Sequence, residues 1–420
     1  MELYLSREGS YLQKASPLEA GEAVPVKIDE GLSHFPFLGF GGAFTESAAH
    51  VYASLSEEDR EAFLKACFSR DGLAYTFGRV CVGSSDFSLG EFDYTEGEDL
   101  STFSLSHEDK KLIPMLLDAK KEAASLSLLA STWSPLALWK DNGQKCHGGK
   151  LKHEDYPKQA QYVALFRKEM EKRGLPVSCL TVQNEPEAKQ TWESCLYSPE
   201  EEAALLKELK KENPDAEIFV HDHNRDNLRR RIDKILSLDS IDASGVAFHW
   251  YDRVAFEEVK KAVLEHPDKR FIFTEGCVET LTNDFAGEIG AYSSFLRYLE
   301  NYIQDLNNGC TLFLDWNLLL DEKGGPNHVG NFCEAPVMMK GGKPFLLPSY
   351  YAIYHLSHFI RPGAKSLRLD SPLPDLFACG VINPDGTKVF VFLNRGEKAV
   401  LNVSGCLFAL EKDQAATLLL

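Results

Sequence analysis

Residues 178–186 read SCLTVQNEP, a short apolar run that closes with the polar pair Asn184-Glu185. Seven similar runs, rich in β-branched and aromatic residues, occur along the chain. Most are continuous rather than alternating in polarity, which is typical of strands buried on both faces of a parallel sheet. The others are FLGFGGAF (37–44), TFGRVCVGSSD (76–86), SLSLLASTW (125–133), AEIFVHDH (216–223), GVAFHWY (245–251), RFIFTEG (270–276) and TLFLDWNL (311–318).

Helical patterns with start signals separate these runs. Ser56 and Ser106 each stand before an amphipathic stretch, and residues 154–173 present one apolar face. Ser198 is followed by Pro199 and, at the third helical position, by a glutamate, which together predict a capping box. Eight strands that alternate with helices predict an α/β fold, a (β/α)₈ TIM barrel over residues 33–340.

The sequence pattern changes after the predicted barrel. Residues 341–420 form short apolar runs broken by turn signals such as Pro384-Asp385-Gly386, and residues 1–32 contain two further strand-like runs. We expect these two segments to form an accessory antiparallel β-sandwich, with the N-terminal strands joining the C-terminal ones.

Composition excludes several classes of protein. The 420 residues include 45 Lys+Arg and 63 Asp+Glu, a net charge of −18, which argues against a nucleic-acid or anionic-membrane partner. No run of eighteen apolar residues and no secretory leader is visible, and ten scattered cysteines contain no C-x-x-C pair. The sequence therefore predicts a cytoplasmic protein without a membrane span, a disulfide framework or a zinc site.

Two glutamates stand where a barrel places its chemistry, at the carboxyl ends of its strands. Glu185 closes the fourth predicted barrel strand and Glu275 the seventh, 90 residues later (275 − 185). One acidic residue at a strand end is more often a solvated loop carboxylate, but a pair at one barrel mouth suits glycoside hydrolysis. There, one carboxyl group protonates the leaving oxygen while the other attacks or activates water.

Aromatic residues at other strand ends favour the same chemistry, because flat rings bind the apolar face of a sugar. Each alone is more often part of a core than a ligand platform. Together they predict the lining of a sugar pocket: Trp133, Tyr251 and Trp316 at strand ends, and Trp192 in the loop after Glu185.

Polar side chains complete this predicted pocket. Asp86, Asn184 and Asn331 are candidates for hydrogen bonds to sugar hydroxyls. Arg79 lies inside a predicted barrel strand, where it has no apolar role, so we expect it to pair with a carboxylate and keep a nucleophile ionised.

Two further patterns do not predict a phosphate or metal site. The glycines at 39, 41 and 42 lack the remaining features of a phosphate loop, and we interpret them as a tight turn after the first strand. His221-Asp222-His223 offers no third ligand at metal-site spacing, so we predict no metal and expect Asp222 near the pocket rim.

Seven motifs, in order, resemble glycoside hydrolase family 30, which includes the lysosomal glucosylceramidases. They are GFGGAFTESAA, GRVCVGSSDFS, ASTWSPLALWKDNG, TVQNEP, FHWYD, FTEG and DWNLLLDEKGGPNHVGNF. The resemblance runs from about residue 39 to the C-terminus and implies the same fold of barrel and β-sandwich.

The resemblance also implies roles for single residues. Glu185 in NEP matches the family's general acid/base and Glu275 in FTEG its nucleophile, with Asn184 beside the acid/base on the sugar 2-hydroxyl. Tyr251 matches a tyrosine beside the nucleophile, and Asp86, Trp133, Trp316 and Asn331 match sugar contacts. These roles imply a retaining mechanism with the two carboxyl groups roughly 5–5.5 Å apart. We expect the charge of Glu275 to raise the pKa of Glu185 enough for it to act as an acid.

The sequence departs from the family pattern at residues 136–138 and at His328, where the lysosomal members carry tryptophan. We expect both places on the aglycone side or at the rim of the pocket. The resemblance therefore says more about recognition of the donor sugar than about the preferred leaving group. We therefore predict an exo-acting retaining β-glycosidase for a small β-glucoside, related β-glycoside or short oligosaccharide, with no cofactor. An endo-β-glucanase or xylanase of the same family and a non-catalytic sugar-binding protein are the alternatives. Oligomeric state does not follow from the sequence.

Overall fold

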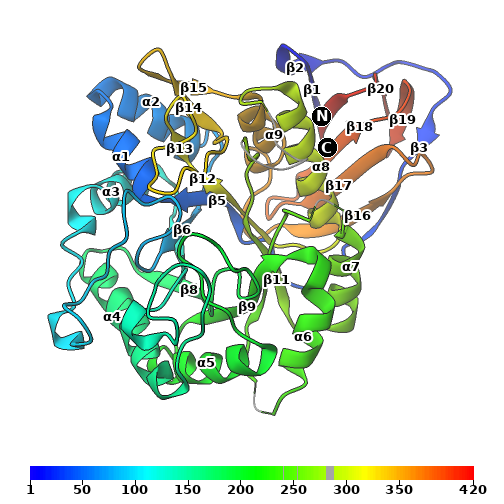
Figure 1. Cartoon of the computed structure of the whole chain (residues 1–420). Coiled ribbons are helices and arrows are strands. Elements are labelled where there is room, and N and C mark those ends of the chain that lie inside the picture. The colour runs from blue at the N-terminus through cyan, green and yellow to red at the C-terminus, as the bar shows by residue number, and fades with distance from the viewer. Residues whose placement is uncertain (240, 253, 281–287) are drawn as a thin grey trace.

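The computed structural model describes residues 1–239, 241–252, 254–280 and 288–420. Its centre is a closed barrel of eight parallel strands, and these are the eight runs predicted from the sequence (Figure 1). In chain order they are β5 (Gly39–Phe44), β6 (Phe77–Cys81), β7 (Ser127–Ser131), β8 (Val177–Thr181), β9 (Glu217–Asn224), β10 (Gly245–His249), β11 (Arg270–Glu275) and β12 (Leu312–Asn317).

Helices surround the barrel, as the alternating pattern predicted (Figure 1). Ser56 caps its helix, and the capping box at Ser198 is present in full. The start signal at Ser106 was wrong: a short 3₁₀ turn comes first, and the helix begins only at Leu112. The helices are α1 (Glu46–Ser54), α2 (Glu57–Phe68), α3 (Leu112–Glu122), α4 (Tyr156–Lys172), α5 (Pro199–Glu212), α6 (Leu228–Leu236), α7 (Phe256–Glu265), α8 (Tyr292–Asn307) and α9 (Pro348–Ser357).

A layer of apolar side chains fills part of the barrel interior. Seven of the eight strands supply buried side chains to it, whereas β5 supplies glycine. A Cβ atom on Gly41 would come 1.9 Å from the carbonyl oxygen of Phe77, so β5 and β6 approach too closely for a side chain there. The three glycines thus lie within strand β5, and the tight turn that we predicted was wrong.

Two further sheets lie beside the barrel, on the right in Figure 1. The larger one is antiparallel, with the order β2-β1-β21-β18-β17-β16-β4, and the smaller has the order β20-β19-β3. Both contribute to one apolar cluster that includes Leu3, Phe390 and Phe408. The strands are β1 (Glu2–Arg7), β2 (Ser10–Ala15), β3 (Val24–Pro25), β4 (Lys27–Glu30), β16 (Lys365–Asp370), β17 (Leu376–Ile382), β18 (Lys388–Asn394), β19 (Ala399–Val403), β20 (Cys406–Leu410) and β21 (Gln414–Leu419).

The two ends of the chain meet in the larger sheet, where β1 pairs with β21. The N-terminal strands therefore join the C-terminal ones, as expected from the sequence, although β2 was not foreseen. A third small sheet, β13 (Leu319–Leu320), β14 (Val337–Lys340) and β15 (Lys343–Leu346), follows the barrel. The β14–β15 hairpin spans the domain boundary that we placed after residue 340.

Among the described residues, no helix has both the length and the apolar character needed to cross a bilayer. All ten cysteines lie in the described part of the chain, and each is a free thiol.

Candidate active site

A pocket of about 310 Å³ opens at the carboxyl ends of the barrel strands. It brings together all eight of the residues predicted to act on or bind substrate, as well as Trp192. Its remaining lining, Gln190, His223, Asn224, Cys277 and Glu279, was not foreseen from the sequence. Arg79 lies below the pocket and is fully buried.

Glu275 is the last residue of β11 and is held from two sides. Its Oε2 accepts a hydrogen bond from Arg79 Nη1 at 2.5 Å, and its Oε1 accepts one from Tyr251 Oη at 3.0 Å. The carboxylate is 7% exposed and lines the pocket. A carboxylate oriented in this way is suited to attack an electrophilic carbon.

Glu185 lies four residues beyond the end of β8 and turns sharply into the pocket. Its backbone is in the left-handed region, with φ of 47°, and its N–H donates to the Asp222 carbonyl at 2.9 Å. Such a conformation is costly for a residue with a side chain and is typical of functional sites. It aims the Glu185 carboxylate at two imidazoles, with His249 Nδ1 at 3.5 Å and His223 Nδ1 at 3.7 Å from Oε1.

These two histidines reverse the pKa shift that we expected for Glu185. Burial raises its pKa, but the interactions with His223 and His249 outweigh burial and hold the pKa below the ordinary value. The expected increase caused by Glu275 was wrong, because sequence reasoning overlooked the imidazoles. Their only signal was position: each stands at the end of a predicted barrel strand.

A buried chain of charges connects the two glutamates beneath the pocket. Arg79 donates from Nη2 to Asp222 Oδ2 at 3.0 Å, and Asp222 Oδ1 accepts from His249 Nε2 at 3.1 Å. Burial raises the pKa of Asp222, but Arg79, His249 and Thr181 outweigh it and lower the pKa. Burial lowers the pKa of His249, whereas Glu275, Asp222 and Glu185 raise it to about 9. Asp222 is fully buried, so its expected place at the pocket rim was wrong.

Two of the sugar-binding candidates, Trp133 and Trp316, lie against the Arg79 end of this chain. Trp133 and Trp316 stack with ring centroids 5.2 Å apart, and the Arg79 guanidinium lies over both rings. Asp86 accepts from Asn331 Nδ2 at 2.9 Å, and burial together with Glu275 raises its pKa well above the ordinary value. Stacked rings beside amide and carboxyl groups suit the apolar face and the hydroxyls of one sugar.

Asn184 is oriented by the same arginine. Its Oδ1 accepts from Arg79 Nη2 at 2.8 Å, so its amide nitrogen is left to donate into the pocket that it lines. Because it directly precedes Glu185, this donor lies beside the acid/base candidate.

Among the described residues, no three His, Cys, Asp or Glu side chains are arranged to hold a metal ion. The His221 ring donates through Nε2 to the carbonyl of Asn224 at 3.0 Å, which gives it a structural role.

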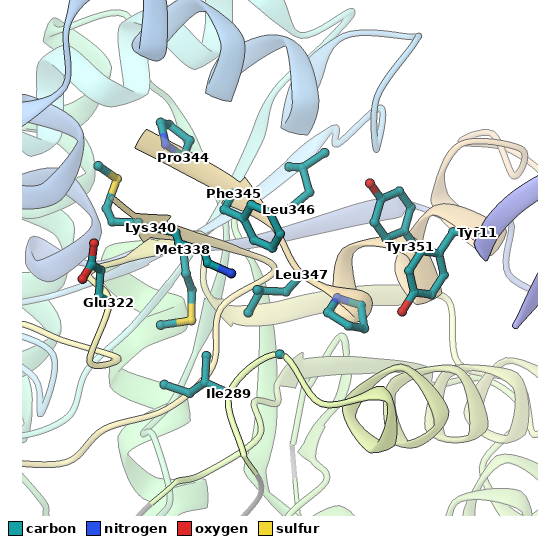
Figure 2. A pocket seen from close by; sticks show the side chains of 13 residues that line it. Tyr11, Ile289, Glu322, Met338, Lys340, Pro344, Phe345, Leu346, Leu347 and Tyr351 are labelled. Carbon is teal, nitrogen blue, oxygen red and sulfur yellow. The ribbon is translucent and has the colours of Figure 1, made fainter. Parts of the chain in front are cut away.

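A second hollow, of about 900 Å³, lies between the β14–β15 hairpin, the start of α9 and Tyr11 (Figure 2). Its walls are mostly apolar, with Met338, Leu346 and Leu347 among them. Glu322 is the single carboxylate among the described residues that line it, so it lacks the pair that distinguishes the first pocket.

Comparisons with known proteins agree with this geometry. The model of the glycosyl hydrolase family 30 TIM-barrel domain matches residues 37–360. The chain belongs to glycoside hydrolase family 30. It is therefore a glycoside hydrolase, as its motifs predicted.

Individual relatives in the family differ in their named activities. The lysosomal acid glucosylceramidase of Mus musculus is 31% identical over 86% of this chain and 75% of its own length. An endo-1,6-beta-D-glucanase of Neurospora crassa is 24% identical over 78% of this chain and 70% of its own. The crystal structure of SrfJ from Salmonella typhimurium is 33% identical, with a TM-score of 0.92 over 100% of this chain and 99% of its own.

Proposed function

We propose that this protein is a retaining β-glycosidase that removes one terminal sugar from a small β-glucoside or related β-glycoside. The observation that carries the proposal is the pair of unlike glutamates in one pocket. Glu275 is held by Arg79 and Tyr251, whereas Glu185 faces two imidazoles. One carboxylate is thus equipped to attack and the other to exchange a proton.

In the first step, Glu275 attacks the anomeric carbon and Glu185 delivers a proton to the leaving glycosidic oxygen. In the second, water hydrolyses the glycosyl ester, and Glu185 accepts the proton of that water. Arg79 and Tyr251 hold the Glu275 carboxylate before attack, and Tyr251 stays beside the ester oxygen afterwards.

His249 explains how a glutamate with a lowered pKa can act as an acid. Its Nε2–H donates to Asp222, so a second proton on Nδ1 points toward Glu185. Moving that proton across to Glu185 leaves a neutral His249 that keeps its hydrogen bond to Asp222. The pair of Glu185 and His249 thus stores the proton that the leaving group takes, and it titrates as a unit.

The size of the pocket favours exo action. A volume of about 310 Å³ lies at the small end of the range of roughly 300–1,000 Å³ for ligand pockets, room for one sugar ring and the start of an aglycone. The name of the Neurospora crassa relative favours endo hydrolysis as the second candidate. Product length separates the two, because an endo enzyme releases products longer than one unit.

The test is hydrolysis of aryl β-glucoside, β-xyloside, β-fucoside and β-galactoside by the purified protein, with Glu275→Gln and Glu185→Gln beside it. We expect turnover of at least one β-glycoside, lost in Glu275→Gln. Sugar binding without turnover on any aryl glycoside or β-glucan oligosaccharide would replace the proposal with a non-catalytic binding protein.

A further inference from the structure

Glu193 is a buried acidic side chain close to the pocket that the proposed reaction does not use. It is 1% exposed, and neither carboxylate oxygen has a hydrogen-bond partner among the described residues. Its charge acts on Asp86, whose pKa it helps to raise. A buried carboxylate without hydrogen bonds costs several kcal/mol unless a cation compensates it.

His328 is the titratable group that lies against Glu193. Its Nε2 lies 3.5 Å from Glu193 Oε2, and its Nδ1 lies 2.9 Å from the carbonyl oxygen of Ser88. A carbonyl only accepts hydrogen bonds, so Nδ1 carries a hydrogen. Nε2 is then the nitrogen that faces Glu193 Oε2, and a single proton carried by either side chain joins the two.

Three pocket-forming segments converge at this pair. Glu193 directly follows Trp192, and His328 precedes Asn331 by three residues. The backbone N–H of His328 also donates to the Ser88 carbonyl at 3.0 Å, two residues after Asp86. The pair therefore ties the loop of Trp192 to the segments that carry Asn331 and Asp86.

The loop of Trp192 is anchored on its other side. Ser194 N donates to the Lys145 carbonyl at 2.9 Å, and the buried Lys140 ammonium donates to the Ser194 carbonyl at 2.6 Å. With one side fixed in this way, the Glu193–His328 contact determines how closely the loop approaches the Asn331 side of the pocket.

We propose that Glu193 and His328 are specificity-determining positioning residues, a clamp that holds Trp192 and Asn331 around a single sugar ring. A clamped wall selects against donor sugars that are extended by a second ring or that fill the pocket incompletely. The inference rests on the proposed function only in assuming that the pocket binds a sugar. The clamp determines which sugar fits, so its effect is measured as a change in binding affinity.

The test uses S-linked aryl β-glycosides, which bind without being cleaved, and calorimetry on the full chain. The glucoside, the smaller xyloside and the extended gentiobioside are compared in wild type, Glu193→Ala, His328→Ala and the double variant. We expect each single variant to lower the preference for the favoured ligand at least tenfold, about 1.4 kcal/mol, with no further loss in the double variant. The His328 side chain is 19% exposed, so replacing it disturbs the core less than replacing Glu193. If Glu193→Ala does not fold, His328→Ala still tests the clamp.

Glu193→Gln is the conservative variant. Its amide N–H can donate to Nε2 of a neutral His328, so the clamp persists without charge and the preference should stay within threefold of wild type. Asp305→Asn is the matched control, since Asp305 is a buried carboxylate on α8 that pairs with Arg225 and lies outside the lining of the pocket.

An unchanged preference in the alanine variants would overturn the clamp. So would an equal loss of affinity for all three ligands, as expected of the control, or a glutamine variant that behaves like alanine. Failure of the proposed function is a separate result, because it is read from turnover of the O-linked glycosides by wild type.

Discussion

Replacing Arg79 by Met removes the cation that links the two sides of the site while keeping most of the side-chain volume. The guanidinium donates to Glu275, Asn184, Asp222 and Ser131, at distances between 2.5 and 3.1 Å, and is fully buried. Two of these partners are carboxylates, so the variant leaves buried negative charges without their cation.

The expected loss of stability follows from this geometry. Breaking a buried ion pair by removing one partner costs about 3–5 kcal/mol. We expect the free energy of unfolding of Arg79→Met to fall by about that amount. Two such penalties do not add in full, because Asp222 retains His249, Thr181 and Thr274 as partners.

The loss should depend on pH in a defined direction. Arg79 helps to lower the pKa of Asp222 in the folded protein, whereas an unfolded aspartate has a pKa near 3.9. The stabilisation is therefore complete above about pH 5 and is lost as the pH falls through the folded pKa. The stability difference between wild type and Arg79→Met should be largest near neutral pH and shrink below about pH 4.

The activity of the folded fraction should fall more than stability alone explains. A hydrogen bond between charged groups contributes about 1.5–3 kcal/mol, so losing the one to Glu275 predicts a decrease in kcat/KM of roughly 10- to 150-fold. The assays are urea unfolding between pH 3 and pH 8 and kcat/KM on the best aryl β-glycoside.

Arg225→Met is the matched control. Arg225 is equally buried and bridges Asp252 and Asp305 at 2.9 and 3.0 Å, but it does not line the pocket. We expect a similar loss of stability with kcat/KM within a few-fold of wild type. Equal decreases in kcat/KM for both variants would refute the assignment of Arg79 to the catalytic carboxylate.

Three further perturbations follow from the same contacts. His249→Gln should move the alkaline limb of kcat/KM below its wild-type position near pH 9, because the proton shared with Glu185 is then lost at lower pH; an unmoved limb would contradict proton storage. Trp192→Ala should raise KM by up to about tenfold in steady-state assays with little change in the midpoint of urea unfolding, because an aromatic contact contributes about 0.5–1.5 kcal/mol and this ring is only partly buried. Burial lowers the pKa of His355 to about 3 in the folded protein. Between about pH 6.5 and pH 3 the unfolded chain therefore binds a proton at His355 that the folded protein does not. The free energy of unfolding should fall by up to roughly 5 kcal/mol over that range. His355→Gln should flatten that slope in urea unfolding, and an equally steep slope would show that other groups cause it.

The sequence predicted the barrel well because each strand is buried on both faces, and such a strand is a continuous apolar run in the sequence. It failed where a backbone detail depends on a neighbouring segment. Gly41 looked like a turn residue, yet its lack of a side chain is needed for the approach of Phe77. Ser106 looked like a helix cap, yet a 3₁₀ turn at residues 108–110 delays the helix by one turn.

The candidate site was predictable in its members but not in its electrostatics. Residues at the ends of parallel strands meet at one mouth, so Glu185 and Glu275 could be paired from order alone. Nothing in the order shows that His223 and His249 both direct Nδ1 at Glu185. Glu193 escaped notice for the same reason, since its relation to His328 depends on two long loops that only the fold brings together.

The most direct test of the double-displacement mechanism is trapping of its covalent intermediate. In a 2-deoxy-2-fluoro aryl β-glycoside of the sugar that wild type prefers, the fluorine slows both steps, whereas a good leaving group speeds only the first, so the covalent intermediate accumulates. We expect the intact mass to increase by one fluorosugar per chain, the label to map to Glu275, and Glu275→Gln to take up none. A label on another residue, or release of the α-anomer as first product of the natural sugar, would contradict it.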